Sequence, residues 1–215
     1  MAKNAILPFG MAIVGDVLSA CQIPGGNTLS ALAVSHIEKR RQEAASILIE
    51  EVSKGLGEGA RFEEYEVDPF IEIILRFSKA VSEGAARDNL RLLAQVIVGQ
   101  KKNKALDGDQ FRRWCGVLEH LTRDELLLLG IGYAISKEQR SSQSDEKAEN
   151  TFWQELDKRM QAGGYEAPEI VAIAASVSRT GLFVPVSAWG GMIFVPSPWL
   201  KKLAGLCDID NLKEL

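Results

Sequence analysis

The sequence predicts a mainly α-helical protein, a helical bundle followed by a winged-helix-like C-terminal module with one β-hairpin. Three observations support this class. Apolar residues recur at helical spacing over most of the 215 residues. Helix start signals precede several of these runs. Two short β-like runs, at 182–186 and 192–195, lie close together near the C-terminus and predict a single hairpin.

The chain is long enough for one large domain or two small ones, and a domain of that size folds without disulfide bonds. We expect an apolar N-terminal helical hairpin at 1–60, a helical bundle at 61–120 and the winged-helix-like module at 121–215. A polar stretch at 138–150, within the last module, is typical of a mobile surface loop.

The composition indicates a protein of the cytoplasm. Cys21, Cys115 and Cys207 are odd in number, widely spaced and each in an apolar context. Such cysteines are typical of buried free thiols in a reducing compartment. The formal net charge of −4 and the isoelectric point near 5.4 give no overall attraction to nucleic acid or to anionic membranes.

The N-terminal segment is unusually apolar, because Asp16 is the only charged residue between positions 5 and 34. Interruptions by proline, glycine and this aspartate argue against a signal peptide. They also argue against a membrane-spanning helix, in which a central Asp costs roughly 2.5–3.5 kcal/mol. We expect a helix buried against the rest of the protein, with membrane contact as the alternative. The candidate residues for contact with a partner or a membrane are Phe9, Met11, Val14 and Leu18.

Four helices are predicted between this segment and residue 120. The first spans about 29–53 and ends at a glycine-rich segment, 55–59, that lacks the preceding strand and the Lys-Ser/Thr of a phosphate loop. The second begins at Asp68 with a proline in its first turn. Apolar positions at helical spacing predict two more helices, at about 85–100 and 109–120.

The clearest local signal is a capping box at 122–125, in which the Thr122 hydroxyl and the Glu125 carboxylate each satisfy a backbone N–H. Leu121 and Leu126 form the matching hydrophobic staple. A helix therefore begins here. After the polar loop, the spacing of apolar residues predicts an amphipathic helix over 151–160.

The order helix, helix, helix, strand, strand, helix after residue 121 is that of a winged-helix domain, with 182–195 as the wing. Its third helix, at 169–179, has Arg179 as its only basic residue, and the wing has none. A DNA reader needs several cationic or amide side chains for phosphates and base edges. We therefore expect this helix and the wing, which carries Trp189, to pack against protein.

Basic residues are concentrated between 91 and 113, where six of them accompany only two aspartates, and an acidic stretch lies upstream at 63–72. Such a patch could neutralise the phosphates of a nucleic acid. It could also face the acidic stretch within the molecule or across an oligomer, although a solvated face is what we expect. The six residues are Arg91, Lys101, Lys102, Lys104, Arg112 and Arg113.

The sequence contains none of the HExxH, GxSxG, Walker-loop or CxxC patterns. Cys115 and His120 are five residues apart, which could place both near one helix face, yet a zinc site needs further ligands. The other histidine, His36, is expected to be structural. We predict no catalytic residue, no metal site and no cofactor, and hence a protein that is not an enzyme.

The apolar N-terminus and four segments after it together resemble the bacterial abortive-infection alpha (Abi-alpha-like) domains: SHIEKRRQEAASILIEEVSKG, ARDNLRLLAQVIVGQ, FRRWCGVLEHLTRDELLLL and RTGLFVPV. The resemblance implies a bacterial or prophage-borne protein linked to phage defence, with no catalytic residues to carry over. We therefore expect a non-enzymatic component that contacts a protein partner or forms a homo-oligomer. A membrane-perturbing effector that inserts residues 5–34, with Lys39-Arg40-Arg41 at anionic headgroups, and a nucleic-acid-binding winged-helix regulator are the alternatives.

Overall fold

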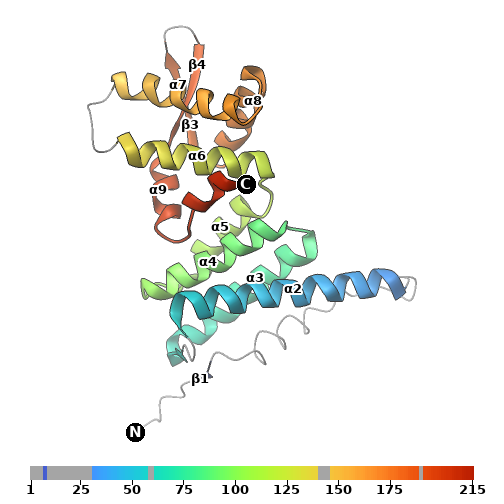
Figure 1. Cartoon of the computed structure of the whole chain (residues 1–215). Helices are drawn as coiled ribbons and strands as arrows, with labels where there is room; N and C mark the ends of the chain where they lie inside the picture. The colour runs from blue at the N-terminus through green and yellow to red at the C-terminus, as the bar shows by residue number, and fades with distance from the viewer. Residues whose placement is uncertain (1–6, 9–30, 58–60, 140–145, 189–190) are drawn as a thin grey trace. The chain divides into compact units, whose positions relative to one another are not determined.

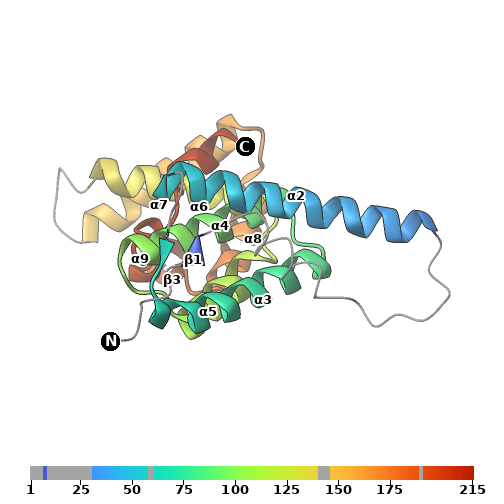
Figure 2. The same cartoon turned by 90° about the horizontal axis from the view of Figure 1, so that it is seen from below.

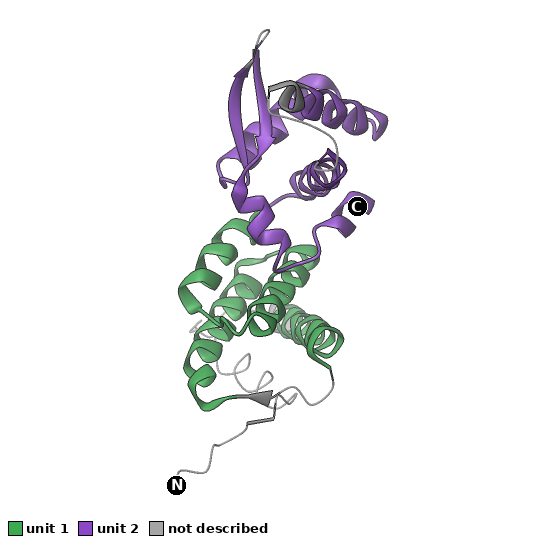
Figure 3. Ribbon diagram, turned by 90° about the vertical axis from the view of Figure 1, so that its left-hand side faces the viewer, with its two compact units in different colours: residues 1–120 green, residues 121–215 purple. Residues whose placement is uncertain are grey.

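The computed structural model describes residues 7–8, 31–57, 61–139, 146–188 and 191–215. The predicted class is confirmed, since the protein is mainly helical and has one antiparallel hairpin near its C-terminus (Figure 1). The chain divides into two compact units, residues 1–120 and 121–215 (Figure 3). The predicted ranges 1–60 and 61–120 thus belong to one unit.

Unit 1 contains, in its described part, the helices α2 (Ala31–Leu56), α3 (Val67–Glu83), α4 (Arg87–Lys102) and α5 (Gly108–Leu118). Helix α2 packs along α4, and α3 packs against α5; Figures 1 and 2 both show α2 beside α4. The sequence did not predict a short strand pair, β1 (Leu7–Pro8) with β2 (Arg61–Phe62), or the 3-10 turn η1 (Glu64–Glu66).

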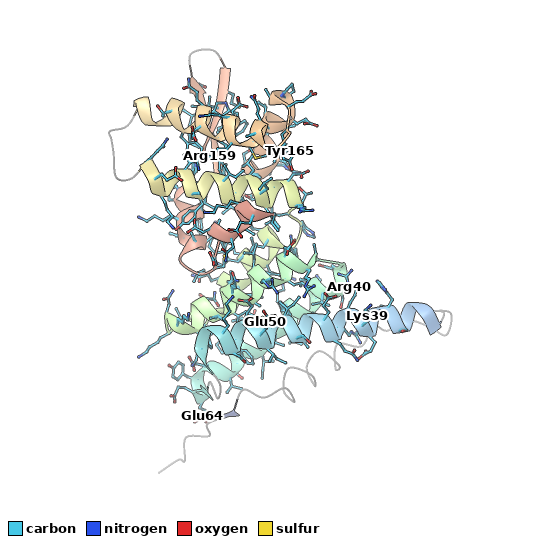
Figure 4. The ribbon with its side chains drawn as sticks, in the orientation of Figure 1. Lys39, Arg40, Glu50, Glu64, Arg159 and Tyr165 are labelled. Carbon is cyan, nitrogen blue, oxygen red and sulfur yellow. The ribbon has the colours of Figure 1, made fainter. Side chains whose placement is uncertain are left out.

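An apolar stripe on α2, which includes Ala44, Leu48 and Val52, is buried as its helical spacing predicts. The absence of a side chain at Gly55 allows close packing against α4, because a Cβ atom there would overlap a methyl group of Val98. The Arg40 guanidinium donates to the carbonyl of Ala85 at 3.0 Å and ties α2 to the start of α4; Figure 4 labels Arg40 on α2.

Unit 2 contains, in its described part, α6 (Arg123–Gln139), α7 (Glu146–Ala162), α8 (Ala167–Ser178), β3 (Phe183–Ala188), β4 (Gly191–Pro196), α9 (Pro198–Ala204) and the 3-10 turn η2 (Asp210–Glu214). Apart from η2, this is the predicted element order. Helix α6 contacts α7, α8 and η2. It is therefore the element that brings α7, α8 and η2 together.

The predicted capping box at the start of α6 is confirmed. The Thr122 N–H donates to Glu125 Oε2 at 2.7 Å, and the Glu125 N–H donates to Thr122 Oγ1 at 3.3 Å. Two glycines later in α6 allow its neighbours to come close. A Cβ on Gly132 would lie 2.6 Å from the ring of Phe183, and one on Gly130 would meet the backbone of η2.

The predicted polar loop at 138–150 is shorter than its composition suggested, because α6 continues to Gln139 and α7 begins at Glu146. Residues 140–145 of that loop lie outside the described residues. An ion pair ties the last turn of α6 to α7: both terminal nitrogens of Arg159 in α7 donate to the Glu138 carboxylate, at 3.2 and 2.7 Å. Figure 4 labels Arg159 on α7.

Candidate interaction surface

Helix α8 has a buried face and an exposed face, and both are apolar. Ile170, Ala174 and Val177 are fully buried at successive helical positions. The opposite side exposes small apolar side chains, namely Pro168, Val171, Ala172 and Ala175, and Val171 is 43 % exposed. Charged and polar residues usually occupy the outer face of a surface helix, so this face is unusual.

Hydrogen bonds to α6 determine which side of α8 faces outward. The Ser176 hydroxyl donates to Oε1 of the buried Glu125, the carboxylate whose other oxygen caps α6. A second hydrogen bond lies within α8 itself and caps its start: the Glu166 N–H donates to Glu169 Oε2 at 2.9 Å. Rotating α8 would break the bond from Ser176 to a buried carboxylate, and such bonds are costly to lose. The apolar side therefore stays exposed.

The hairpin buries its aromatic residues against α7 and α6. The ring centroid of Phe194 lies 5.6 Å from that of Trp153 in α7, and the same helix supplies Phe152, 6.1 Å from Phe183. In Figure 1, α7 runs across the two strands, and it contacts β4. Val184 and Met192 of the hairpin remain 39 % and 59 % exposed.

Helix α8 contacts both strands, so the exposed residues of the helix and the hairpin are described together. We call the exposed apolar residues Val171, Ala172, Ala175, Val184 and Met192 the unit 2 surface; the strand register places Val184 and Met192 on opposite faces of the hairpin. Arg179, at the C-cap of α8, is the only charged residue in the sequence between positions 170 and 200. The cores of protein–protein contacts contain few charged residues, whereas a phosphate-binding surface depends on charged residues. The chemistry of this surface therefore suits a protein.

The lack of basic residues in this region is evident from the sequence, but the spacing of apolar residues does not distinguish Val171, Val184 or Met192. These three side chains are exposed, whereas neighbouring apolar side chains such as those of Ile170 and Phe194 are buried. The run from 170 to 200, in which Arg179 is the only charged residue, is the signal that could have found them.

The six residues of the predicted basic patch all lie in unit 1, and three of them form ion pairs between helices or turns. Arg91 pairs with Glu51 at 3.3 Å, Arg112 with Glu72 at 2.7 Å, and Lys101 with the buried Glu66. The acidic stretch at 63–72 thus meets the basic stretch at two points inside unit 1. Lys102, Lys104 and Arg113 have exposed side chains.

Unit 1 also has an open depression of about 560 Å³ beside the starts of α3 and α5. Four carboxylates line it, those of Asp68, Glu72, Asp107 and Asp109. Arg112 pairs with two of them, Glu72 and Asp109, and Asp107 accepts two backbone N–H groups as the N-cap of α5. Within the described residues, no group of three His, Cys, Asp or Glu side chains is arranged to hold a metal ion.

The Glu119 carboxylate lies between Cys115 and His120. The Cys115 thiol donates to Glu119 Oε2 at 3.4 Å, and His120 Nε2 lies 3.4 Å from the other oxygen. Burial, reinforced by the negative charge of Glu119, raises the pKa of the Cys115 thiol to about 12. A catalytic cysteine needs the opposite environment, because the thiolate is the nucleophile. His36 is exposed on α2, not buried as a structural histidine would be.

Unit 1 exposes two large apolar side chains on one side of α3, Ile71 and Leu75. Charged residues of the same helix, Glu72 and Lys79, are exposed beside them. Scattered apolar residues of this kind are ordinary on protein surfaces. They provide a matched comparison for the unit 2 surface.

The remaining predicted contact residues, Phe9, Met11, Val14 and Leu18, lie outside the described residues, as does Trp189 of the predicted wing. Among the helices that the structure describes, none combines the length and the apolar character that crossing a bilayer requires. No protein-family model, curated protein or solved structure matches the chain. The resemblance to the Abi-alpha-like domains therefore remains a prediction from the sequence.

Proposed function

We propose that this chain is a non-enzymatic, cytoplasmic protein-interaction component of a bacterial or prophage phage-defence system of the abortive-infection type. The observation that carries the proposal is the uncharged, exposed unit 2 surface on α8 and the hairpin. Exposed apolar area of this kind is typical of protein contacts. The link to phage defence rests on the sequence resemblance alone.

The two other predicted functions have less support from the residues described. A nucleic-acid site in unit 1 would have to use basic side chains of which Arg91, Lys101 and Arg112 are held by carboxylates. Each such pair offsets a positive charge that would otherwise attract phosphate. A membrane function would depend on residues 5–34, most of which lie outside the described part of the chain.

A phage-plating experiment with two matched variants tests the proposal. In the first variant, V171K, V184K and M192K place charge on the unit 2 surface. In the second, I71K and L75K place charge on the exposed side of α3. All five side chains are at least a third exposed, and substitutions at such sites usually change stability by less than about 0.5 kcal/mol.

We expect bacteria that express the unchanged protein to reduce phage plating. The unit 2 variant should restore plating to the level on cells without the protein, while the α3 variant keeps its effect. Full protection by the unit 2 variant would overturn the interaction surface. An unchanged protein that affects no phage in a broad panel would overturn the role in defence.

Two further measurements separate the alternatives. Dye leakage from anionic vesicles that disappears when Phe9, Met11, Val14 and Leu18 are changed to Ser would favour the membrane effector. Binding to duplex DNA that weakens steeply with salt, and that is lost on changing Lys102, Lys104 and Arg113 to Gln, would favour the nucleic-acid regulator.

A further inference from the structure

Helix α8 carries opposite charges at its two ends and none on the exposed face between them. Glu166 and Glu169 are exposed at its N-terminal end, and Arg179 is exposed at its C-terminal end. Between the two ends, the exposed side consists of Val171, Ala172 and Ala175. The ten-residue separation of Glu169 and Arg179 corresponds to about 15 Å along the helix.

This pattern is complementary to itself when two such helices pack antiparallel. A two-fold axis that passes midway between Ala172 and Ala175 would bring each of these alanines opposite the other on the second helix. The same operation would bring Glu169 of each helix next to Arg179 of the other. A parallel arrangement would instead put like charges together, which destabilises a contact.

The side chain of Arg179 already lies on the correct side of the helix for this contact. Its Nη2 donates to Ser176 Oγ at 2.6 Å, so the guanidinium leans toward Ser176. Glu169 is seven residues, close to two helical turns, before Ser176 and therefore lies on the same side of α8. Both charges consequently flank one edge of the apolar face.

We propose that α8 is the contact between two copies of this chain, packed antiparallel about a two-fold axis, with reciprocal Glu169–Arg179 ion pairs at its ends. This inference rests on the proposed function and names its partner as a second copy. A two-fold contact places a patch against the same patch on the second copy. Because the centre of this patch is uncharged, no like charges meet there. Alanine at the centre allows the helix axes to approach toward the lower end of the usual 8–10 Å range.

The hairpin beside α8 enlarges the area available to the second copy. Helix α8 contacts both strands, and Val184 and Met192 are exposed there. Because the strand register puts these two residues on opposite faces of the hairpin, only one of them can extend the apolar part of the contact beyond the 12 residues of α8. Charge between positions 170 and 200 is limited to Arg179, which already has a partner in this arrangement.

Charge reversal on the full-length chain tests the inference, with the molar mass measured by light scattering and the dissociation constant by sedimentation. The variants are E169K and R179E, each alone and the two mixed. In either variant alone, both reciprocal pairs become like-charged, so we expect dimerisation to weaken at least about tenfold. In the mixture, a dimer of one E169K chain and one R179E chain has two pairs of opposite charge, and dimerisation should recover.

The mixture also shows whether α8 has simply unfolded, because an unfolded helix would not regain a partner on mixing. K201E, an exposed change on α9, is the matched control and should leave the dissociation constant unchanged. An unchanged chain that is monomeric up to high concentration would overturn the inference. The inference would also be overturned if the unchanged chain dimerised but neither charge reversal weakened dimerisation. The same would follow if mixing the two variants did not restore dimerisation.

These outcomes are distinct from failure of the proposed function. A monomeric chain that still reduces phage plating, and loses this effect in the V171K/V184K/M192K variant, would keep the function and assign the surface to a different protein. A dimer with the expected charge dependence and no effect on any phage would keep the inference and remove the role in defence.

Discussion

Unit 1 and unit 2 differ in where they place their charged side chains. In unit 1, ion pairs connect neighbouring elements: Lys101 with Glu66, Arg112 with Glu72, Arg91 with Glu51 and Arg87 with Glu43. In unit 2, ion pairs connect α6 to α7 and to η2, through Glu138 with Arg159 and Lys137 with Asp210. Helix α8 and the hairpin take no part in these pairs.

The difference shows that a local excess of charge in a sequence is a poor guide to a binding surface. The basic stretch at 91–113 is the most conspicuous charged feature of the sequence, and at least three of its six basic residues form ion pairs within unit 1. The inconspicuous run from 170 to 200 has Arg179 as its only charged residue and is partly exposed. An exposed apolar region with so little charge is the rarer arrangement, and it is the observation from which we propose a contact with protein.

Each unit has a buried thiol, and the largest expected effect is the slow alkylation of both thiols relative to a free cysteine. Burial, then the charge of Glu119, raises the pKa of Cys115 in unit 1 to about 12. Burial, then the charge of Asp208, raises the pKa of Cys207 in unit 2. Since an ordinary thiol has a pKa near 8.5, the thiolate fraction of Cys115 at pH 8 should be lower by roughly a thousandfold.

We therefore expect both thiols of a C21S variant to react with iodoacetamide far more slowly than a free cysteine, as followed by mass spectrometry at each site. Because the alkylated thiol must first be exposed, Cys115 reports the opening of unit 1 and Cys207 that of unit 2. Reaction of either thiol at the rate of free cysteine would contradict the burial of that unit's core.

The next largest effect comes from removing one fully buried ring in each unit, Phe77 in α3 or Phe183 in β3. Each change to Ala should lower the free energy of unfolding by about 3–5 kcal/mol, because the ring is lost and a cavity remains. Hydrogen exchange should show the lost protection of F77A within residues 61–118 and that of F183A within residues 123–214. Equal loss in both units from one change would mean that the two cores unfold together.

Much of the fold could be predicted because its causes are local. Phe70, Ile74, Phe77 and Val81 recur at helical spacing in the sequence, which predicts one buried stripe on α3, and all four are buried. The capping box at Thr122 and Glu125 is also a property of four consecutive residues. The hairpin followed from two β-like runs separated by a glycine-containing turn.

Features that depend on distant residues could not be predicted in this way. The two-residue strands β1 and β2 pair across more than 50 positions, and η2 is held where Gly130 lets its backbone approach α6. Whether the side chains of the basic stretch form ion pairs depends on which carboxylates lie opposite them in space. The candidate surface was missed for the same reason, since periodicity predicts that α8 is apolar but not that one apolar side of it is left uncovered.

The smallest expected effects come from one ion pair in each unit, and they test whether charge stabilises unit 1 more than unit 2. Glu66 is buried, accepts the Glu63 N–H at 2.8 Å and pairs with Lys101. K101M should lower the free energy of unfolding by about 3 kcal/mol, because it leaves the buried carboxylate without its cation. The double change K101M/E66Q should recover most of that loss, since glutamine can still accept the Glu63 N–H.

The pair in unit 2 should contribute less, because Glu138 is more than half exposed and water screens its interaction with Arg159. R159M should cost no more than about 1 kcal/mol in the same denaturant measurement. The hydrogen bonds from Arg159, with a smaller contribution from its charge, hold the pKa of Glu138 below its usual range. This stabilisation is therefore present above the pKa of Glu138 in the unfolded chain and is lost as the pH falls through its pKa in the folded protein.

In R159M the carboxyl resonance of Glu138 should titrate at its ordinary pKa, and the part of the acid destabilisation due to this group should vanish. If R159M instead destabilised the protein more than K101M does, the contrast between the units would be wrong. The ion pairs of unit 2 would then be as important to its stability as those of unit 1, and the uncharged surface would be a local feature of α8 and the hairpin only.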